Sequence, residues 1–352
     1  MHDLALYRKY RPKNFKEVLG QDHIVKVLES SVEANKVSHA YLFVGSRGTG
    51  KTSVARIFAN EIGVSANDLY EIDAASNRGI EDIKELRDGA RVLPFDSKYK
   101  VYIIDEVHML SKDAWGALLK TLEEPPKHVI FILATTEFHK VPETIISRCQ
   151  VFTFKKASDV VCKKMLTDVG KKEGFDLDAG SAELLAVLSD GSFRDGLGEL
   201  QKVLNFSGSK KTRLDSARLV NREDVEKITG APKATLVNDF ISAIAEKNIE
   251  KGISVVRSAA EENLDMELYL KLIIAKFRMA IILRYAPKLK GEMIGDLSEA
   301  DLEFLQILIK ESGEMFNSST LATLLEAYQN IDNAFITELP LELALVKILS
   351  KE

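Results

Sequence analysis

Apolar and polar positions divide the chain into an N-terminal part that alternates strand and helix patterns and a C-terminal part with helix patterns. Short apolar runs bounded by polar or glycine-containing segments predict buried strands as far as about residue 154. Helix patterns such as Ile80–Val92 and Asp113–Leu122 lie between them. This alternation predicts a parallel sheet with helices on both faces. The strands we expect are Tyr41–Val44, Leu69–Ile72, Val101–Ile104, Val129–Ala134 and Val151–Phe154.

The strand pattern stops after Lys155, and the remaining sequence predicts helices. Asp159–Glu173, Ala179–Leu188 and Arg194–Leu204 have helical patterns, and beyond Pro232 the chain is predicted to be wholly helical. We therefore predict an α/β fold with three domains: an α/β domain over residues 1–156, a small helical domain over 157–231, and an all-α domain over 232–352.

A phosphate-binding loop follows the first predicted strand. The sequence from Gly45 to Thr52 matches G-x-x-x-x-G-K-[ST], between an apolar run and a helix pattern. Backbone N–H groups of such a loop surround phosphates, and the helix N-terminus adds a positive dipole end. Lys51 can reach the β- and γ-phosphates and Thr52 can hold Mg²⁺. The residues expected to bind a nucleoside triphosphate here are Gly45, Ser46, Arg47, Gly48, Thr49, Gly50, Lys51, Thr52 and Ser53.

Two later strand ends supply candidate catalytic groups. The strand that begins at Val101 ends in Asp105, placed to hold Mg²⁺, and Glu106, which can act as general base toward water. The reaction implied is hydrolysis of the β–γ bond. Thr136 closes the next strand and can sense the γ-phosphate or hold the water, although strand propensity explains a threonine there equally well.

Composition narrows the choice of partners. The chain has 352 residues and a net charge of −5, so nucleic acid would have to bind through local patches. Cys149 and Cys162 lack metal-ligand spacing. No signal peptide is recognisable, and the apolar stretch near residues 268–285 carries basic residues such as Lys276, which predicts a core helix. We expect a cytoplasmic protein with no membrane partner.

Three basic positions remain open from the residues alone. Arg148 before the last strand can be an arginine finger for a neighbouring subunit's nucleotide or one half of a surface salt bridge. Arg194 can reach the γ-phosphate or belong to an ordinary helix start. The arm from Tyr7 to Pro12 can touch phosphate or nucleic acid, or border the nucleotide base.

Several of these segments occur together in one family. They are Tyr10-Arg11-Pro12, Gly45–Thr52, Ile104–Leu110 (I-D-E-V-H-M-L), Leu118–Pro126 (L-L-K-T-L-E-E-P-P), Ala134-Thr135-Thr136 and Ser147-Arg148-Cys149. The chain resembles the bacterial DNA polymerase III gamma/tau family, AAA+ ATPases that drive the sliding-clamp loader. The resemblance implies a RecA-like ATPase domain, a helical lid, and a helical collar that holds a pentameric ring of loader subunits.

The same resemblance assigns roles to individual residues. It implies ATP and Mg²⁺ as ligands, and the sliding clamp, primer–template DNA and other loader subunits as partners. Catalysis would rest on Lys51, Glu106, Thr136 as first sensor and Arg148 as a finger acting in trans, with Arg194 as second sensor. The residues expected to border the adenine are Arg8, Tyr10, Arg11 and Pro12.

DNA contacts are expected from helix N-termini that face the inside of the ring, because backbone N–H groups there suit phosphate. For the side chains of Arg78 and Lys120, a solvated surface charge is an equally simple explanation. The expected DNA-contacting residues are Asn77, Arg78, Gly79 and Lys120.

Two departures from the family pattern affect the prediction. The interval Asn60–Asp68, where relatives carry a four-cysteine zinc module, is short and has no cysteine, so we predict no zinc. The sequence ends with the expected collar, which suggests a gamma-like form without the long tau tail.

Two alternative functions stay open beside a clamp-loader motor. A non-hydrolysing nucleotide-binding scaffold is disfavoured by the presence of Lys51, Asp105, Glu106 and Arg148. Another AAA+ DNA motor, such as a branch-migration helicase, is disfavoured by the collar-like C-terminal helices.

Overall fold

A computed structural model describes residues 4–77, 79–209, 218–289 and 299–350. The chain divides into two compact units. The first comprises Met1–Cys162 with Ser189–Gly198, and the second comprises Lys163–Leu188 with Glu199–Glu352. No helix in the described ranges is both long and apolar enough to cross a membrane.

The first unit is built on a five-stranded sheet in the order β2-β3-β4-β1-β5, with every neighbouring pair parallel. Each strand agrees with its predicted span to within one residue at either end. The predicted α/β class with a parallel sheet is therefore confirmed. The strands are β1 (Ala40–Val44), β2 (Leu69–Asp73), β3 (Lys100–Asp105), β4 (Val129–Thr135) and β5 (Gln150–Thr153).

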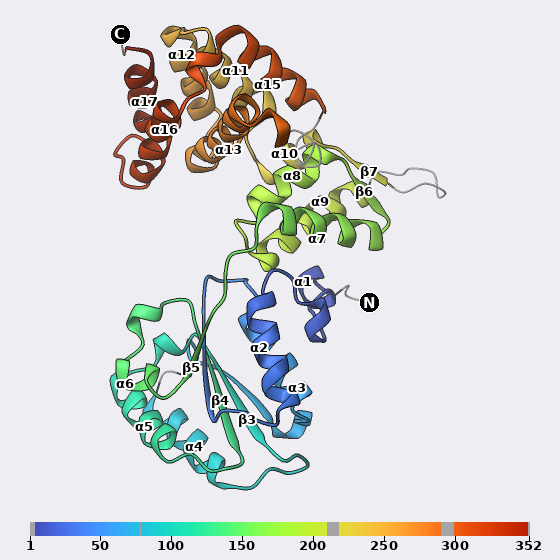
Figure 1. Cartoon of the computed structure of the whole chain (residues 1–352), viewed down its shortest axis with the longest axis vertical. Helices are drawn as coiled ribbons and strands as arrows, with labels where there is room; N and C mark the ends of the chain where they lie inside the picture. Colours follow the sequence, from blue (N-terminus) through green and yellow to red (C-terminus); the bar gives the residue numbers. More distant parts are fainter. Residues whose placement is uncertain (1–3, 78, 210–217, 290–298, 351–352) are drawn as a thin grey trace. The chain divides into compact units, whose positions relative to one another are not determined.

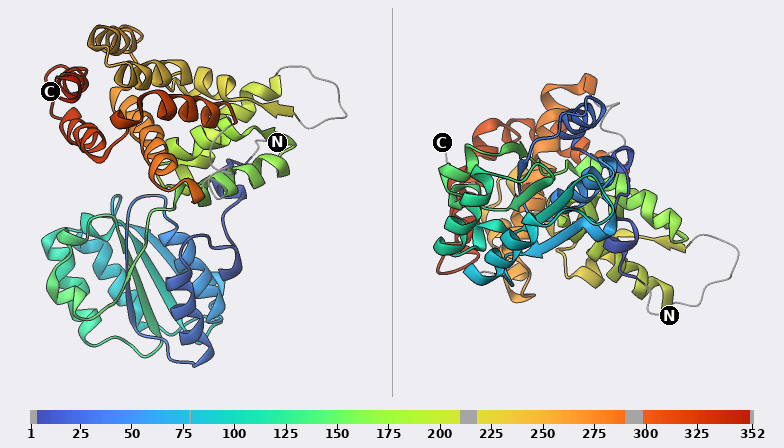
Figure 2. Two further views of the ribbon diagram at one scale, coloured as in Figure 1. Left: turned by 45° about the horizontal axis from the view of Figure 1, so that its top comes forward. Right: turned by 90° about the horizontal axis from the view of Figure 1, so that it is seen from below.

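Helices cover both faces of this sheet (Figures 1 and 2). Successive residues of β1 point to opposite faces. Leu42 packs in the cluster with α4, α5 and α6, whereas Tyr41 and Phe43 pack in the cluster with α2 and α3. The helices and turns of this unit are α1 (Leu6–Lys9), η1 (Phe15–Glu17), α2 (Asp22–Glu33), α3 (Lys51–Glu61), η2 (Ala66–Asp68), α4 (Ile80–Arg91), η3 (Val107–Met109), α5 (Lys112–Glu123), η4 (Phe138–Lys140) and α6 (Glu143–Ile146).

The second unit is mostly helical but contains a two-stranded parallel sheet, formed by β6 (Phe175–Leu177) and β7 (Arg218–Val220). The expectation of no strands after Lys155 was therefore wrong. Each of these strands has three residues, too few to show an alternation in sequence, and each is stabilised by a partner distant along the chain. The pairing continues where the Asp178 N–H donates to the Val220 carbonyl, 3.1 Å away.

The structure describes further helices and turns after β5, of which α7 and α9 contribute residues to both units. They are α7 (Asp159–Lys172), α8 (Ala179–Leu188), α9 (Phe193–Ser209), α10 (Arg222–Thr229), α11 (Ala234–Ala245), α12 (Ile249–Glu261), α13 (Met266–Tyr285), η5 (Pro287–Leu289), α15 (Glu299–Ser312), η6 (Gly313–Met315), α16 (Ser318–Ile331) and α17 (Leu339–Leu349). The helix α13 is buried along much of its length, as predicted for a core helix, and Lys276 is buried with it. The boundary at residue 231 between lid and collar remains a prediction.

Candidate nucleotide-binding site

The loop between β1 and α3 has a backbone that requires glycine. Gly48 has φ of +74°, and a Cβ there would lie 1.9 Å from Ser192 Oγ. A Cβ added at Gly45 would lie 2.6 Å from the Phe154 carbonyl oxygen. Gly50 has φ of +101° and stands at the N-terminus of α3. The loop thus curls tightly, and the N-terminus of α3 faces the inside of this curve. Phosphate-binding loops have the same arrangement.

Lys51 lies inside this loop and is only 5% exposed. Its ammonium group donates to the carbonyls of Gly45 at 2.8 Å and Ser46 at 3.0 Å. Burial lowers the pKa of Lys51, while Glu106 and Asp105 act in the opposite direction. A buried ammonium held mainly by neutral carbonyls would gain from an anionic ligand, and a phosphate is the ligand that this loop geometry admits.

Thr52 and Asp105 bring a hydroxyl and a carboxylate together. The Thr52 hydroxyl, in the first turn of α3, donates to Asp105 Oδ2 at 2.7 Å. The other oxygen, Asp105 Oδ1, accepts the Glu106 N–H at 3.0 Å. Both groups offer hard oxygen ligands of the kind that Mg²⁺ prefers, so the donor set fits a nucleotide-associated magnesium ion.

Glu106 is held by the neighbouring strand end. It has φ of +47°, a left-handed conformation that costs a non-glycine residue about 1–2 kcal/mol and is often found at functional sites. Its Oε2 accepts the Thr136 hydroxyl at 3.0 Å. Because β4 lies between β1 and β3, the sheet order places Thr136 between the glycine loop and the acidic pair.

His108 and Glu137 join this group, and sequence reasoning did not single them out. His108 Nδ1 lies 3.0 Å from Thr135 Oγ1 and 3.4 Å from Glu106 Oε2. His108 Nε2 lies 3.2 Å from Glu137 Oε1, and the histidine side chain is 6% exposed. The available signal was the position of His108, two residues after the strand-end acidic pair.

The N-terminal arm and the start of α9 supply positive charge in the same unit. Arg11 Nε donates to Ser53 Oγ at 2.9 Å, beside the first turn of α3. Burial lowers the pKa of Arg11, and the positive charges of Arg56 and Arg194 lower it further. The carboxylates of Glu71 and Asp105 act in the opposite direction. An anionic ligand would relieve this repulsion.

Arg194 and the glycine loop approach each other through the start of α9. The Phe193 N–H donates to the Gly48 carbonyl at 3.1 Å. The Arg194 guanidinium lies over the Tyr7 ring, 5.0 Å from its centroid. Arg8 and Tyr10 belong to or adjoin α1, and Pro12 follows Arg11. These contacts place Arg194 and the arm in one region, but the adenine assignment remains a prediction.

Arg148 forms an ion pair in this structure. Its Nη2 donates to Glu123 Oε1 at 2.9 Å and its Nη1 to the Thr144 carbonyl at 2.6 Å. Both side chains of the pair are about a third to a half exposed, at 34% and 44%. Exposed pairs contribute less than about 1 kcal/mol, so Glu123 can orient Arg148 without preventing its movement.

The expected DNA-contacting residues differ in what they offer. Lys120 is exposed on α5. The Gly79 N–H donates to Asp82 Oδ2 at 3.1 Å, and the Asn77 side chain donates to the Asp73 carbonyl at 3.0 Å. Arg78 lies outside the described residues. The start of α4 therefore has partners of its own, and DNA binding there remains a prediction.

A buried carboxylate, Asp68, joins the interval without cysteines to the segment before β3. Asp68 is fully buried and accepts backbone N–H groups from Phe95, Asp96 and Ser97 at 2.5–2.8 Å. Burial raises the pKa of Asp68, but these hydrogen bonds outweigh it and hold the pKa at about 2. The described part of the chain contains no group of three His, Cys, Asp or Glu able to hold a metal ion.

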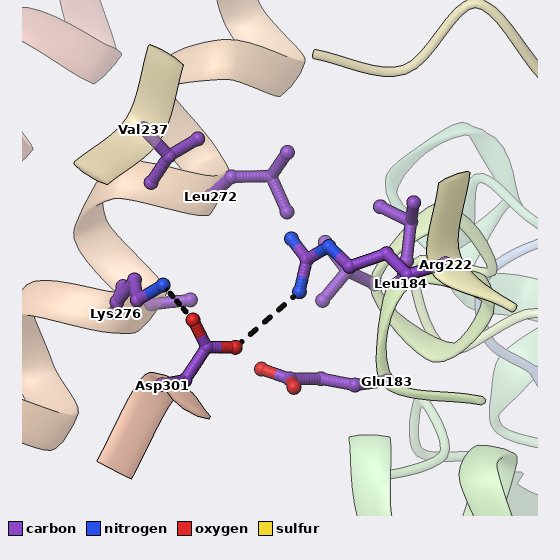
Figure 3. Close-up of a pocket in the computed structure, with 9 residues that line it drawn as sticks. Glu183, Leu184, Arg222, Val237, Leu272, Lys276 and Asp301 are labelled. Carbon is purple, nitrogen blue, oxygen red and sulfur yellow. Dashed lines mark hydrogen bonds and ion pairs between the residues drawn. The ribbon is translucent and has the colours of Figure 1, made fainter. Parts of the chain in front are cut away.

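A second charged cluster is buried in the second unit (Figure 3). Asp301 of α15 accepts from Lys276 of α13 and lies 3.6 Å from Arg222 of α10. Arg222 also pairs with Glu226 at 3.0 Å. Glu183 of α8 faces this group, and its Oε2 has no hydrogen-bond partner among the described residues.

The space between these side chains measures about 20 Å³. That is room for about one water molecule and far too little for a nucleotide. Burial raises the pKa of Glu183 to about 7, against the opposing effect of Arg222. We interpret this cluster as part of the structural core, and the nucleotide site as the group around Lys51.

The glycine loop after β1, its buried lysine and the acidic pair after β3 define a P-loop nucleotide-binding protein. The fold is similar to that of RuvB from Thermotoga maritima. A solved structure titled "Holliday junction branch migration motor" matches 73% of this chain and 86% of the RuvB chain, with a TM-score of 0.53 and 19% sequence identity. This likeness shows the fold alone, a RecA-like α/β architecture with a parallel sheet.

Sequence comparison finds relatives that match most of the chain. The chain is 39% identical to DNA polymerase III subunit tau of Bacillus subtilis over 88% of its own length and 60% of the relative's. It is 38% identical to DNA polymerase III subunit gamma/tau of Mycoplasma genitalium, over 85% of the chain and 52% of the relative. A family model described as "DNA polymerase III, delta subunit" matches residues 20–68 and 63–158. The chain is similar over most of its length to DNA polymerase III gamma/tau subunits, and it spans about half to three fifths of the length of these relatives.

Proposed function

We propose that this chain is an ATP-hydrolysing motor subunit of a sliding-clamp loader in DNA replication. The observation that carries the proposal is the Thr52–Asp105 hydrogen bond of 2.7 Å beside the buried Lys51. It supports a site for the phosphates and Mg²⁺ of a nucleotide at the ends of β1 and β3. The process is suggested by the relatives, which are named as DNA polymerase III subunits.

Binding would begin with an exchange of partners at the loop. Lys51 would leave the Gly45 and Ser46 carbonyls for the β- and γ-phosphates, and the loop N–H groups would surround the β-phosphate. Thr52 and Asp105 would hold Mg²⁺, directly or through water, and the ion would neutralise developing charge on the phosphates. Arg11, with Arg8, Tyr10 and Pro12, would border the adenine.

Hydrolysis would use Glu106 as general base. Its carboxylate accepts a proton from the water that attacks the γ-phosphorus, while the bond to the leaving ADP oxygen breaks. Thr136 holds Glu106 at 3.0 Å and is suited to sensing the γ-phosphate. Arg194 would approach the γ-phosphate from the start of α9, and Arg148 would supply charge in trans to a neighbouring subunit's nucleotide.

The remaining parts of the proposal concern assembly. Residues 1–156 would form the ATPase domain, 157–231 a lid and 232–352 a collar that joins subunits into a pentameric ring. Primer–template DNA would contact Asn77, Arg78, Gly79 and Lys120, and the ring would open the clamp and release it on DNA after hydrolysis. A chain ending at Gly230 should bind ATP but fail to assemble.

The test is the ATPase rate of the full chain, with its loader partners, in the presence and absence of clamp and primed DNA. We expect stimulation by clamp and primed DNA together. Nucleotide binding without turnover would instead favour a scaffold. Stimulation by a four-way DNA junction but not by the clamp would favour a branch-migration motor.

The role of Arg148 in trans has a separate test. Rings of Arg148→Ala chains and rings of Lys51→Ala chains should both lose stimulated hydrolysis, whereas mixed rings should regain part of it. Recovery is expected because some interfaces then pair an intact Lys51 with an intact Arg148. Absence of recovery in rings that demonstrably assemble would leave Arg148 as a structural residue.

A further inference from the structure

His108 lies between two carboxylates beside the proposed catalytic base. One ring nitrogen faces Glu106 and Thr135, and the other faces Glu137. The side chain is 6% exposed, so neither nitrogen depends on bulk water for its partners. A buried polar ring with a partner at each nitrogen holds these partners at a fixed distance from each other.

The backbone that carries His108 is anchored in the core. The residue sits in the middle of η3, where the Met109 N–H donates to the Glu106 carbonyl at 2.9 Å. Val107 and Leu110 on either side are buried in the core against the sheet. The backbone position of His108 beside Glu106 is therefore anchored by the core.

The end of β4 contacts both ring nitrogens. Thr135 is fully buried, and its Oγ1 accepts the Glu137 N–H at 3.0 Å as well as contacting His108. Glu137 is paired with Lys140 at 2.7 Å, and the hydrogen bond from Lys140 is the main cause that lowers the Glu137 pKa. A stable negative charge thus faces His108 Nε2.

Two side chains meet the same oxygen of Glu106. Thr136 contacts Oε2 at 3.0 Å, and His108 Nδ1 lies 3.4 Å from the same oxygen. A carboxylate held by one oxygen keeps the other available as a proton acceptor in a defined direction. Precise placement of this kind matters, because a misplacement of about 1 Å can cost on the order of 100-fold in rate.

We propose that His108 is a positioning residue that holds the Glu106 carboxylate and links it to the Thr135–Glu137 segment at the end of β4. The inference rests on the proposed ATPase function, in which Glu106 is the base. It adds that the position of Glu106 follows that of the β4 end, where Thr136 would meet the γ-phosphate.

The experiment uses His108→Ala, His108→Asn and His108→Gln in the full chain, with loader partners, clamp and primed DNA. Asparagine can return an amide group near the Nδ1 position, toward Glu106 and Thr135. Glutamine can return one near the Nε2 position, toward Glu137. The readouts are kcat, KM, nucleotide Kd by fluorescent titration, and the thermal midpoint.

We expect His108→Ala to lower kcat on the order of 10- to 100-fold while the nucleotide Kd changes less than about threefold. His108→Asn should recover most of kcat, and His108→Gln should not, because only asparagine restores a group beside Glu106. A merely structural role would instead lower the thermal midpoint and raise Kd in parallel with the loss of kcat.

Three results would overturn the inference: full kcat in His108→Ala, recovery by glutamine but not asparagine, or parallel loss of kcat, Kd and thermal midpoint in all variants. Wild-type protein and Glu106→Gln are run beside them. An inactive wild type, or an active Glu106→Gln, would count against the proposed function itself. An active wild type, an inactive Glu106→Gln and an unaffected His108→Ala would count against His108 alone.

Discussion

The two units each contain a cluster of lysine, arginine and carboxylate side chains. The clusters differ in whether the positive charges are already paired with acidic side chains. Around Lys51, the ammonium is bound to loop carbonyls, and Thr52 and Asp105 bind each other at the end of a parallel sheet. Around Asp301, the charges of Lys276 and Arg222 are matched by acidic side chains in a space for about one water.

The difference teaches that a buried charge or a shifted pKa is not by itself a sign of a ligand site. Glu183 has its pKa raised to about 7, yet its surroundings have no room for a substrate. The Lys51 site is recognised by its position after β1, by the conformation of Gly45 and Gly48, and by neutral partners that a phosphate can replace. Mutations in the two clusters should therefore affect different measurements.

The largest expected effect comes from Glu106→Gln. The amide cannot accept the proton from water, so turnover should fall by a factor on the order of 10²–10⁴, with ATP affinity kept. Single-turnover phosphate release and nucleotide titration measure the two quantities on one sample. Normal hydrolysis by Glu106→Gln would remove the general-base role from this residue.

In the second cluster, Asp301→Ala should destabilise the second unit without changing ATP affinity. Removing Asp301 leaves Lys276 buried with one acidic partner fewer, and breaking a buried pair in this way costs about 3–5 kcal/mol. Chemical denaturation measures the loss. The matched control is Lys347→Ala, whose pair with Glu326 is half exposed and should cost less than about 1 kcal/mol. Equal losses of unfolding free energy in Asp301→Ala and Lys347→Ala would show that burial does not make the Asp301 pair more important for stability than an exposed pair.

Glu183 should give the second cluster a modest pH dependence. Its pKa is raised to about 7 by burial, from an ordinary value of about 4.3 in the unfolded chain. The folded state therefore binds the proton more tightly, so this stabilising contribution is full below about pH 4 and is lost as the pH rises through about 7. Thermal midpoints of Glu183→Gln and wild type should diverge in favour of the variant between these pH values. Parallel profiles would contradict the assignment.

The smallest expected effect is at the edge of the nucleotide site. Arg11→Ala removes the hydrogen bond to Ser53 and one positive charge, so ATP affinity should fall by about 0.5–1.5 kcal/mol, or several-fold. Arg87→Ala, which removes a surface arginine paired with Asp88, is the control. A nucleotide titration in which both variants match wild type would exclude Arg11 from the site.

Local patterns in the sequence were sufficient for the sheet and for the centre of the site. The strands and the glycine loop depend on neighbouring residues, so β1, Gly45–Thr52 and Asp105 were predicted where the structure has them. The two short strands β6 and β7 were not, because their stability comes from a pairing between segments far apart along the chain.

The contacts that sequence reasoning missed are also between distant segments. His108 meets Glu137 across 29 positions of sequence, and Lys276 meets Asp301 across 25. Lys276 was predicted to interrupt an apolar helix, but its partner could not be chosen among the many acidic residues. The Gly79 N–H was expected to be open to phosphate, yet Asp82 in the following turn accepts it.

Nucleotide titration of Lys51→Ala is the most direct test of the claim that the first cluster is the ligand site. We expect ATP affinity to fall below detection, because the phosphates lose the buried ammonium, while the thermal midpoint without nucleotide stays close to that of wild type. Wild-type ATP affinity in Lys51→Ala would contradict the account. So would ATP affinity lost only together with the fold.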